Sequence, residues 1–173
     1  MVDEPGFTCS CCGQWHGEPP LSFGAPAPDF WREDLAGDPG FELTRDRCVV
    51  GGEAFFLRGL IEIPVLDTGN VFSWGVWVSL SQSNYARAGQ VWEQPGREGE
   101  PPYFGWLSTE LTAYPVSTIN LKTNLHTRPL GLAPLIELEP TDHPLAVEQR
   151  TGITTDRLRQ ISEMLLHPPA ART

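Results

Sequence analysis

Two consecutive stretches in which apolar side chains alternate with others constrain the fold of this chain most. Residues 71–80 place alternate side chains, all aromatic or aliphatic, on one face, and serine, glycine and Trp77 on the other. Residues 53–65 alternate in a similar way and follow a glycine pair at 51–52 that is typical of a hairpin turn. Because a period of two is the period of a β-strand and the connections are short, the pattern predicts antiparallel pairing.

Shorter elements are predicted on both sides of these two strands. Further strands are expected at residues 48–50, 103–108, 116–126 and 135–138, and helices at 28–35, 81–94, 142–150 and 154–166. The expected N-caps of the last three helices are Ser81 or Ser83, Asp142 and Thr154. The fold class that fits is α+β, with an antiparallel sheet of about five strands and helices packed on one face.

A cysteine cluster near the N-terminus adds a zinc knuckle to this fold. Cys9 and Cys12 have the spacing of a knuckle, and Gly13 allows the tight turn that such a loop needs. Cys11 lies between them and is expected to point away from a metal that they share. A redox role is less well supported, because thioredoxin-like motifs lie between a strand and a helix and a proline-rich loop follows here.

A closed zinc site needs two more ligands. His16 follows Cys12 by four residues, and Cys48 is the one thiol far from the cluster. The predicted structural zinc site consists of Cys9, Cys12, His16 and Cys48. His126 or His143 can replace Cys48 as the fourth ligand, in which case Cys48 is a buried residue of its strand.

The charge of the chain limits its partners. Asp and Glu number 22 and Lys and Arg 12, so the formal net charge is −10. Such a surface repels nucleic acid and anionic membranes and suits a basic protein partner. No apolar run reaches the ~20 residues of a membrane span, and residues 1–5 lack the features of a signal peptide. The expected compartment is the cytoplasm, and the sequence predicts no oligomeric state.

The length of 173 residues fits a single domain. Its expected parts are the zinc knuckle at 7–17, a proline-rich wrap with a short helix at 18–47, the sheet with one inserted helix at 48–138, and the C-terminal helices at 142–166.

Polar residues that interrupt the apolar strands outline a second candidate site. The side chains expected to line a ligand cleft are Arg58, Glu62, Trp77, Lys122, His126, Arg128 and His143. The simpler interpretation is an exposed ion pair between Arg58 and Glu62 and structural roles for the two histidines. The chain carries no nucleophile elbow, phosphate loop, dinucleotide fingerprint or His-Glu-x-x-His motif, so no catalytic residue is assigned.

Several motifs together resemble an uncharacterised bacterial family, a domain of unknown function. They are Cys9-x-x-Cys-Gly-x-x-His16, Arg47-Cys-Val-Val50, Phe56-Leu-Arg-Gly59, Glu62-Ile-Pro64, Trp74-Gly-Val-Trp-Val-Ser-Leu-Ser81, Tyr103-Phe-Gly-Trp106, Asn120-Leu-Lys-Thr123, Asp142-His-Pro-Leu145 and Gln149-Arg-x-Gly152. The resemblance covers about residues 7–166 and implies a single domain in a bacterial cytoplasm. It implies no activity, substrate or catalytic residue.

Two functional hypotheses follow. The first is a non-enzymatic binding or regulatory protein with a structural zinc ion, such as an immunity-like partner of a basic toxin. The alternative is a small enzyme that acts on an anionic small molecule, through an open zinc position or a cleft near Arg58, His126 and His143. The number of protein ligands on the zinc distinguishes them, because four indicate a structural site and three with water a catalytic one.

Overall fold

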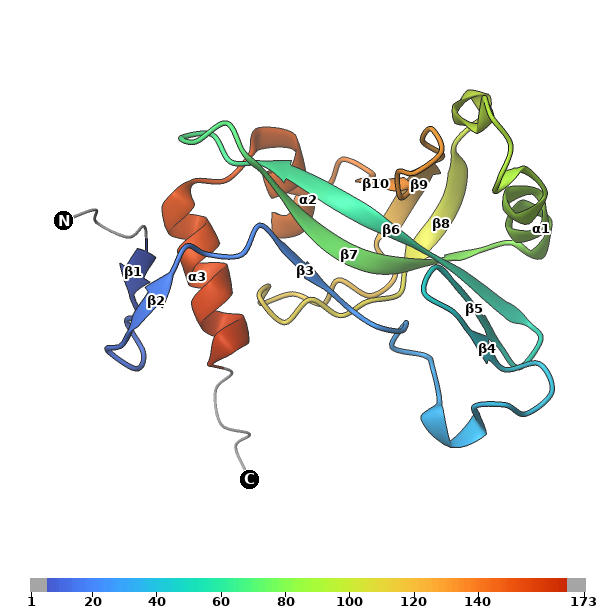
Figure 1. Cartoon of the computed structure of the whole chain (residues 1–173), viewed down its shortest axis with the longest axis horizontal. Helices are drawn as coiled ribbons and strands as arrows, with labels where there is room; N and C mark the ends of the chain where they lie inside the picture. Colours follow the sequence, from blue (N-terminus) through green and yellow to red (C-terminus); the bar gives the residue numbers. More distant parts are fainter. Residues whose placement is uncertain (1–5, 168–173) are drawn as a thin grey trace.

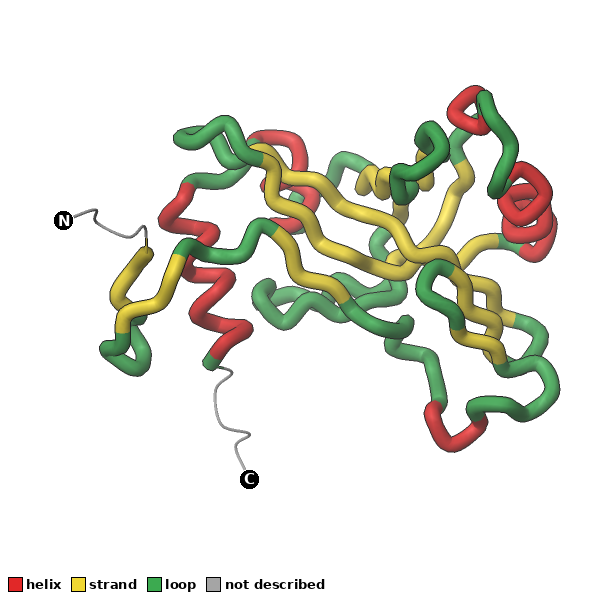
Figure 2. The backbone as a smooth tube through the Cα atoms, in the orientation of Figure 1, coloured by secondary structure: helices red, strands yellow, loops and turns green. Residues whose placement is uncertain are grey.

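The computed structural model describes residues 6–167 of the chain. Its strands are β1 (Gly6–Thr8), β2 (Trp15–Gly17), β3 (Ser22–Gly24), β4 (Glu42–Leu43), β5 (Arg47–Val50), β6 (Ala54–Pro64), β7 (Val71–Leu80), β8 (Tyr103–Leu107), β9 (Lys122–His126) and β10 (Leu135–Leu138). The helices are α1 (Gln82–Val91), α2 (Pro144–Thr151) and α3 (Thr155–Leu166), with 3₁₀ turns η1 (Glu33–Leu35) and η2 (Arg97–Gly99). Figure 2 shows how much of the remaining backbone is loop.

Strands β6 to β10 close into a five-stranded barrel (Figure 1). Antiparallel pairing joins each of them to the next, and a parallel contact between Leu135 of β10 and Leu60 of β6 closes the ring. Strands β3, β4 and β5 extend the sheet beyond the barrel, and β3 is parallel to β7. The α+β class is therefore confirmed, but the prediction of a simple antiparallel sheet is wrong. The closing contact joins residues far apart in sequence, which no local pattern encodes.

The long hairpin of β6 and β7 forms as its alternation predicts. All ten residues of β7 pair with β6, and the apolar face of β7 lies in the main hydrophobic core. Burial of this face stabilises the fold by roughly 25 cal/mol for each Å² of apolar surface removed from water. The other face is apolar in part, because Trp77 packs with Phe56 and Cys48 in a second, smaller core outside the barrel.

The helices lie at opposite ends of the molecule, with α1 at one end and α2 and α3 at the other (Figure 1). This arrangement replaces the predicted layer of helices on one face. Ser81 and Thr154 cap α1 and α3 as expected, and each side chain accepts a backbone N–H of its first turn. None of the helices in residues 6–167 has both the length and the apolar character needed to cross a membrane.

The N-cap of α2 is His143 rather than the predicted Asp142. Nδ1 of His143 accepts a hydrogen bond from the N–H of Leu145 at 3.1 Å. This bond leaves the proton on Nε2, which donates to the carbonyl oxygens of Val116 and Ser117. The imidazole ring therefore joins the start of α2 to a neighbouring loop.

Two predicted elements are shorter than expected. The helix predicted at residues 28–35 is only the 3₁₀ turn η1, and the strand predicted at 116–126 begins at Lys122. In the segment before β9, Thr118 is fully buried and its hydroxyl group bonds backbone groups of Thr109 and Leu111. These side-chain bonds compete with strand pairing and hold the segment as a loop.

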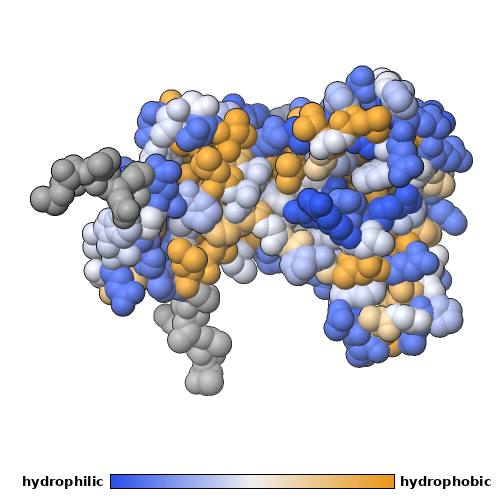
Figure 3. All heavy atoms as spheres, in the orientation of Figure 1, coloured by the Kyte–Doolittle hydropathy of each residue, from blue (hydrophilic) through white to orange (hydrophobic). Residues whose placement is uncertain are grey.

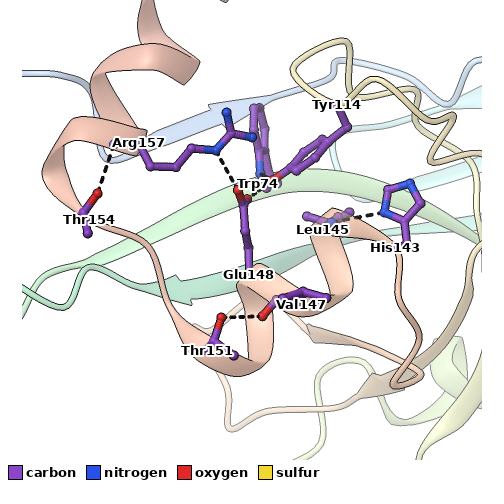
Figure 4. Close-up of polar contacts among 9 residues, drawn as sticks. All are labelled: Trp74, Tyr114, His143, Leu145, Val147, Glu148, Thr151, Thr154 and Arg157. Atoms are coloured by element: carbon purple, nitrogen blue, oxygen red, sulfur yellow. Dashed lines mark hydrogen bonds and ion pairs between the residues drawn. The ribbon is translucent and has the colours of Figure 1, made fainter.

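A polar network fixes α3 against the barrel (Figure 4). Trp74 of β7 donates its indole N–H to the Tyr114 hydroxyl group, which donates to Oε2 of Glu148 at 2.6 Å. The other carboxylate oxygen of Glu148 accepts from Nε of Arg157 at 2.6 Å. Burial, together with the bond to Glu148, raises the pKa of Tyr114, so this phenol stays protonated. The position of α3 matters because its C-cap residue belongs to the candidate site.

Candidate metal centre

A small N-terminal hairpin holds the cysteine cluster. Strands β1 and β2 pair antiparallel, with Phe7 opposite His16. In the loop between them, the N–H of Cys9 donates to the carbonyl of Gln14, and the N–H of Gly13 donates back to the carbonyl of Cys9. Gly13 has φ of +68°, a left-handed conformation that costs glycine little. The turn therefore brings the side chains of Cys9 and Cys12 close to that of His16 in β2.

Four side chains meet at this hairpin with metal-ligating atoms that all lie within 4.8 Å of one another. They are Cys9, Cys12, His16 and His167. Sγ of Cys12 lies 3.4 Å from Nε2 of His16 and 3.6 Å from Nε2 of His167. The two Nε2 atoms are 3.4 Å apart. Ligands around tetrahedral zinc are separated by roughly 3.3–3.8 Å, as follows from Zn–S of about 2.3 Å and Zn–N of about 2.0 Å.

The C-terminal helix supplies the fourth member of the group. His167 is the C-cap of α3, and its N–H donates to the carbonyl of Glu163 one turn earlier. The Glu163 carboxylate accepts from both the N–H and the hydroxyl group of Ser10, at 2.9 and 2.5 Å. These two bonds lower the pKa of Glu163. Ser10 and Glu163 therefore hold the cysteine loop beside the last turn of α3.

The thiols of the cluster differ in their ease of ionisation. Burial disfavours the thiolate of Cys9, but hydrogen bonds from the side chain and backbone of Cys11 and the backbone of Cys12 outweigh it and lower its pKa. The bond to Cys9, 2.8 Å between sulfur atoms, raises the pKa of Cys11 to about 11. Because metals bind the thiolate, Cys9 is the better donor of this pair. Cys11 lies outside the four-residue group.

The structure brings together three of the four predicted ligands and places Cys48 elsewhere. Cys48 is fully buried in β5 and packs against Phe56 and Trp77. Burial raises its pKa to about 11, which keeps the thiol protonated and unsuited to a metal. Cys48 is therefore not part of the group that the structure brings together, and His167 takes the fourth position. Sequence reasoning missed His167 because 151 positions separate it from His16 and no spacing motif connects them.

His126 and His143, the alternative ligands, also lie outside the group of Cys9, Cys12, His16 and His167, which we call the metal group. His126 has its Nε2 3.7 Å from Oε1 of Glu137 on the neighbouring strand. His143 caps α2, as described above. The ring of His143 is held by hydrogen bonds at both nitrogens, whereas Nε2 of His126 is buried and forms no hydrogen bond to the described residues.

The residues of the predicted cleft do not gather in one place. Glu62 pairs with Arg128 at 2.7 Å rather than with Arg58, so the predicted Arg58–Glu62 ion pair does not form. Trp77 is fully buried and donates its indole N–H to the carbonyl of Ala25, so it does not line a pocket. Lys122 is exposed and lies opposite Trp106 in the β8–β9 pair.

Comparison with family models matches residues 8–153 to a family described as an uncharacterized protein conserved in bacteria (DUF2199). This match confirms the resemblance that the motifs indicated. It includes Cys9, Cys12 and His16, but it ends before α3, so that His167 lies outside it. Comparisons with curated proteins and with solved structures gave no match.

Proposed function

The chain belongs to the DUF2199 family, and from its own geometry we propose that it is a non-enzymatic binding protein stabilised by a structural zinc ion. The observation that carries the zinc assignment is the spacing of Cys12, His16 and His167, which equals the edges of a zinc tetrahedron. Two sulfurs and two imidazole nitrogens are a common structural-zinc set, and thiolate with imidazole favours zinc over magnesium or calcium.

Four protein ligands leave no open position for water or substrate, which supports a structural rather than a catalytic ion. In this proposal the ion joins the β1–β2 hairpin to the end of α3. Its binding free energy would add to the stability of this contact, because the unfolded chain has no preformed site.

The metal proposal is tested by zinc content and coordination. Protein purified without added metal is expected to hold about one zinc per chain, with two sulfur and two nitrogen neighbours by X-ray absorption. His167→Ala and Cys12→Ser are expected to lower the zinc affinity strongly. The matched controls His126→Ala and Cys48→Ala change the same residue types outside the group and should retain the ion. Unchanged zinc affinity in His167→Ala would contradict the proposed ligand set, and a bound water in place of one ligand would contradict a structural role.

The binding partner that we propose is a basic protein in the cytoplasm, as for an immunity protein that neutralises a toxin. The net charge of −10 supports a basic partner. An apolar groove of about 570 Å³ beside β8 offers a docking surface, lined in part by Phe30, Phe56 and Trp106. Phe30 and Trp106 are 48% and 41% exposed, and partly exposed aromatic side chains are frequent anchors in interfaces.

Acidic residues precede two of the residues that line this groove. Asp29 adjoins Phe30 in sequence, and its carboxylate accepts the N–H of Glu110. Glu53 adjoins Ala54, another lining residue. Lys122, opposite Trp106, is a basic exception. An apolar centre with carboxylates nearby suits a partner that presents an apolar side chain among lysines or arginines.

The partner proposal is tested by capture on the immobilised full chain followed by mass spectrometry. We expect the chain to capture a basic protein that is eluted by salt. The Trp106→Ala variant is expected not to capture this protein. Trp15→Ala is the matched control, because it removes the same kind of side chain, 54% exposed, from β2 and outside the lining of the groove. Capture of an acidic protein only, or equal loss in both variants, would refute the proposal.

A further inference from the structure

A second cavity lies at the point along β6 where its pairing partner changes from β5 to β10. The first residues of β6, up to Leu57, pair with β5, and Leu60 pairs with β10. Between these pairings the N–H of Arg58 donates to the carbonyl of Asp46, and the N–H of Leu60 donates to the carbonyl of Pro134. The crevice between the two diverging strands is a cavity of about 400 Å³, and both Asp46 and Pro134 line it.

Two arginines of this cavity are unusual within the chain. Every other arginine of residues 6–167 donates to at least one acceptor. In the same part of the chain, the guanidinium groups of Arg45 and Arg58 form no hydrogen bond and no ion pair, and both residues are among those that line the cavity. Acidic residues are nearly twice as numerous as basic ones in the chain, yet neither of these arginines pairs with a carboxylate within residues 6–167, so both are available to an anionic ligand.

The backbone around Arg58 leaves room for its side chain. Gly75 of β7 lies beside the guanidinium group, and a Cβ atom at this position would be 2.8 Å from Nη2 of Arg58. Gly24 of β3, the register partner of Gly75, has the same relation at 3.2 Å. Larger residues at either position would displace the guanidinium group. Figure 3 shows strongly hydrophilic side chains in the middle of this face of the molecule, between apolar patches.

A third arginine forms the wall of the cavity without being available to a ligand. Arg97 is buried and donates to the carbonyls of Trp92, Arg128, Pro129 and Leu132. No carboxylate of the described residues pairs with it, so its positive charge remains uncompensated beside the cavity. Its bonds fix the loop that carries the apolar lining residues Leu130 and Leu132.

We propose that this cavity binds a small organic anion, with a carboxylate or phosphate group between Arg45 and Arg58 and its apolar part against the 130–134 loop. A guanidinium group presents paired donors that match either oxyanion. Asp46 and Glu93 also line the cavity, but three arginines against two carboxylates leave it positive in a protein of negative net charge. This site shares no residue with the proposed zinc site or with the aromatic groove.

The test is a titration of the full ¹⁵N-labelled chain, followed by NMR, with sodium phosphate in one arm and sodium benzoate in the other at matched ionic strength. The indole N–H of Trp92, which lines the cavity, reports on binding. Saturable shifts of this signal with either probe support the site, and the arm that saturates identifies the preferred oxyanion. Arg58→Gln is expected to weaken binding at least tenfold, Arg45→Gln to weaken it less, and Arg58→Lys to retain part of it.

Arg159→Gln is the matched control, because it removes the same charge from α3 at the other end of the molecule (Figure 1). Full binding in this variant, together with an unchanged spectrum of Arg58→Gln outside the cavity, separates loss of the ligand contact from loss of fold. The absence of saturable shifts with both probes would overturn the proposal. Equal affinity in Arg58→Gln and the wild-type chain would overturn it as well.

Discussion

At the scale of single residues, environment decides what each cysteine does. Cys9 and Cys12 reach the metal group because a tight turn brings them beside His16, whereas Cys48 is enclosed by Phe56 and Trp77. The same residue type is a candidate metal donor where hydrogen bonds stabilise the thiolate and a packing residue where burial keeps the thiol neutral.

Replacement of Cys48 by alanine tests this distinction. Cys48→Ala leaves a small cavity in the second core, so we expect the free energy of unfolding to fall by about 1–2 kcal/mol. Zinc content per chain should not change. Urea denaturation and metal analysis of the same sample measure both quantities. If the variant loses zinc, Cys48 is a ligand after all.

At the scale of elements, short polar contacts set how helices meet strands. Glu100 accepts two bonds from Arg87 of α1 and one from the Tyr103 hydroxyl group at the start of β8. The bonds from Arg87 and Tyr103 hold the pKa of this carboxyl group at about 2, against 4.5 in the absence of such contacts. The ionised carboxylate therefore ties α1 to the barrel.

This contact predicts an acid-sensitive share of the stability. Because the pKa is lower in the folded chain, the stabilisation is complete above about pH 5 and is lost as the pH falls toward 2, where the folded carboxylate takes up a proton. Glu100→Gln should remove this dependence, so the difference in urea midpoint between the wild-type chain and the variant should shrink between pH 5 and pH 2. Glu98→Gln, a neighbouring exposed residue, is the control. A constant difference across this range would contradict the assignment.

At the scale of the whole molecule, one contact turns a sheet into a barrel. β10 reaches β6 through a single parallel pair, and Gly59 beside it allows the approach. A Cβ atom at position 59 would lie 2.7 Å from Cδ1 of Ile136 and 2.9 Å from the carbonyl oxygen of Pro134. The carbonyl cannot rotate away as a side chain can, because Leu60 donates to it.

Gly59→Ala is therefore expected to lower the free energy of unfolding by about 1–3 kcal/mol through overpacking at the closure of the barrel. Amide hydrogen exchange should rise in β10 before it rises in β7. The control is Gly99→Ala, because a Cβ atom there meets nothing within 4 Å. Equal stability of the two variants would show that the closure tolerates the methyl group.

Much of the secondary structure follows from the sequence alone. The alternation at residues 71–80 predicts β7 with its observed bounds, and the apolar segment at 135–138 likewise predicts β10. The hydroxyl side chains of Ser81 and Thr154 mark the start of two helices. These features depend on side chains and backbone groups within a few residues of each other, so local sequence carries them.

The closure of the barrel, the fourth member of the metal group and the crevice with Arg45 and Arg58 are decided only by the tertiary structure. Each joins segments that are distant in sequence: β10 with β6, the N-terminal hairpin with the end of α3, and β5 with the 130–134 loop. Periodicity and spacing motifs describe residues that are near one another along the chain, and they contain no information about contacts between distant segments. The sequence by itself determined a cysteine cluster beside a sheet. Packing determined that His167, and not Cys48, lies with Cys9, Cys12 and His16, because the second core encloses Cys48.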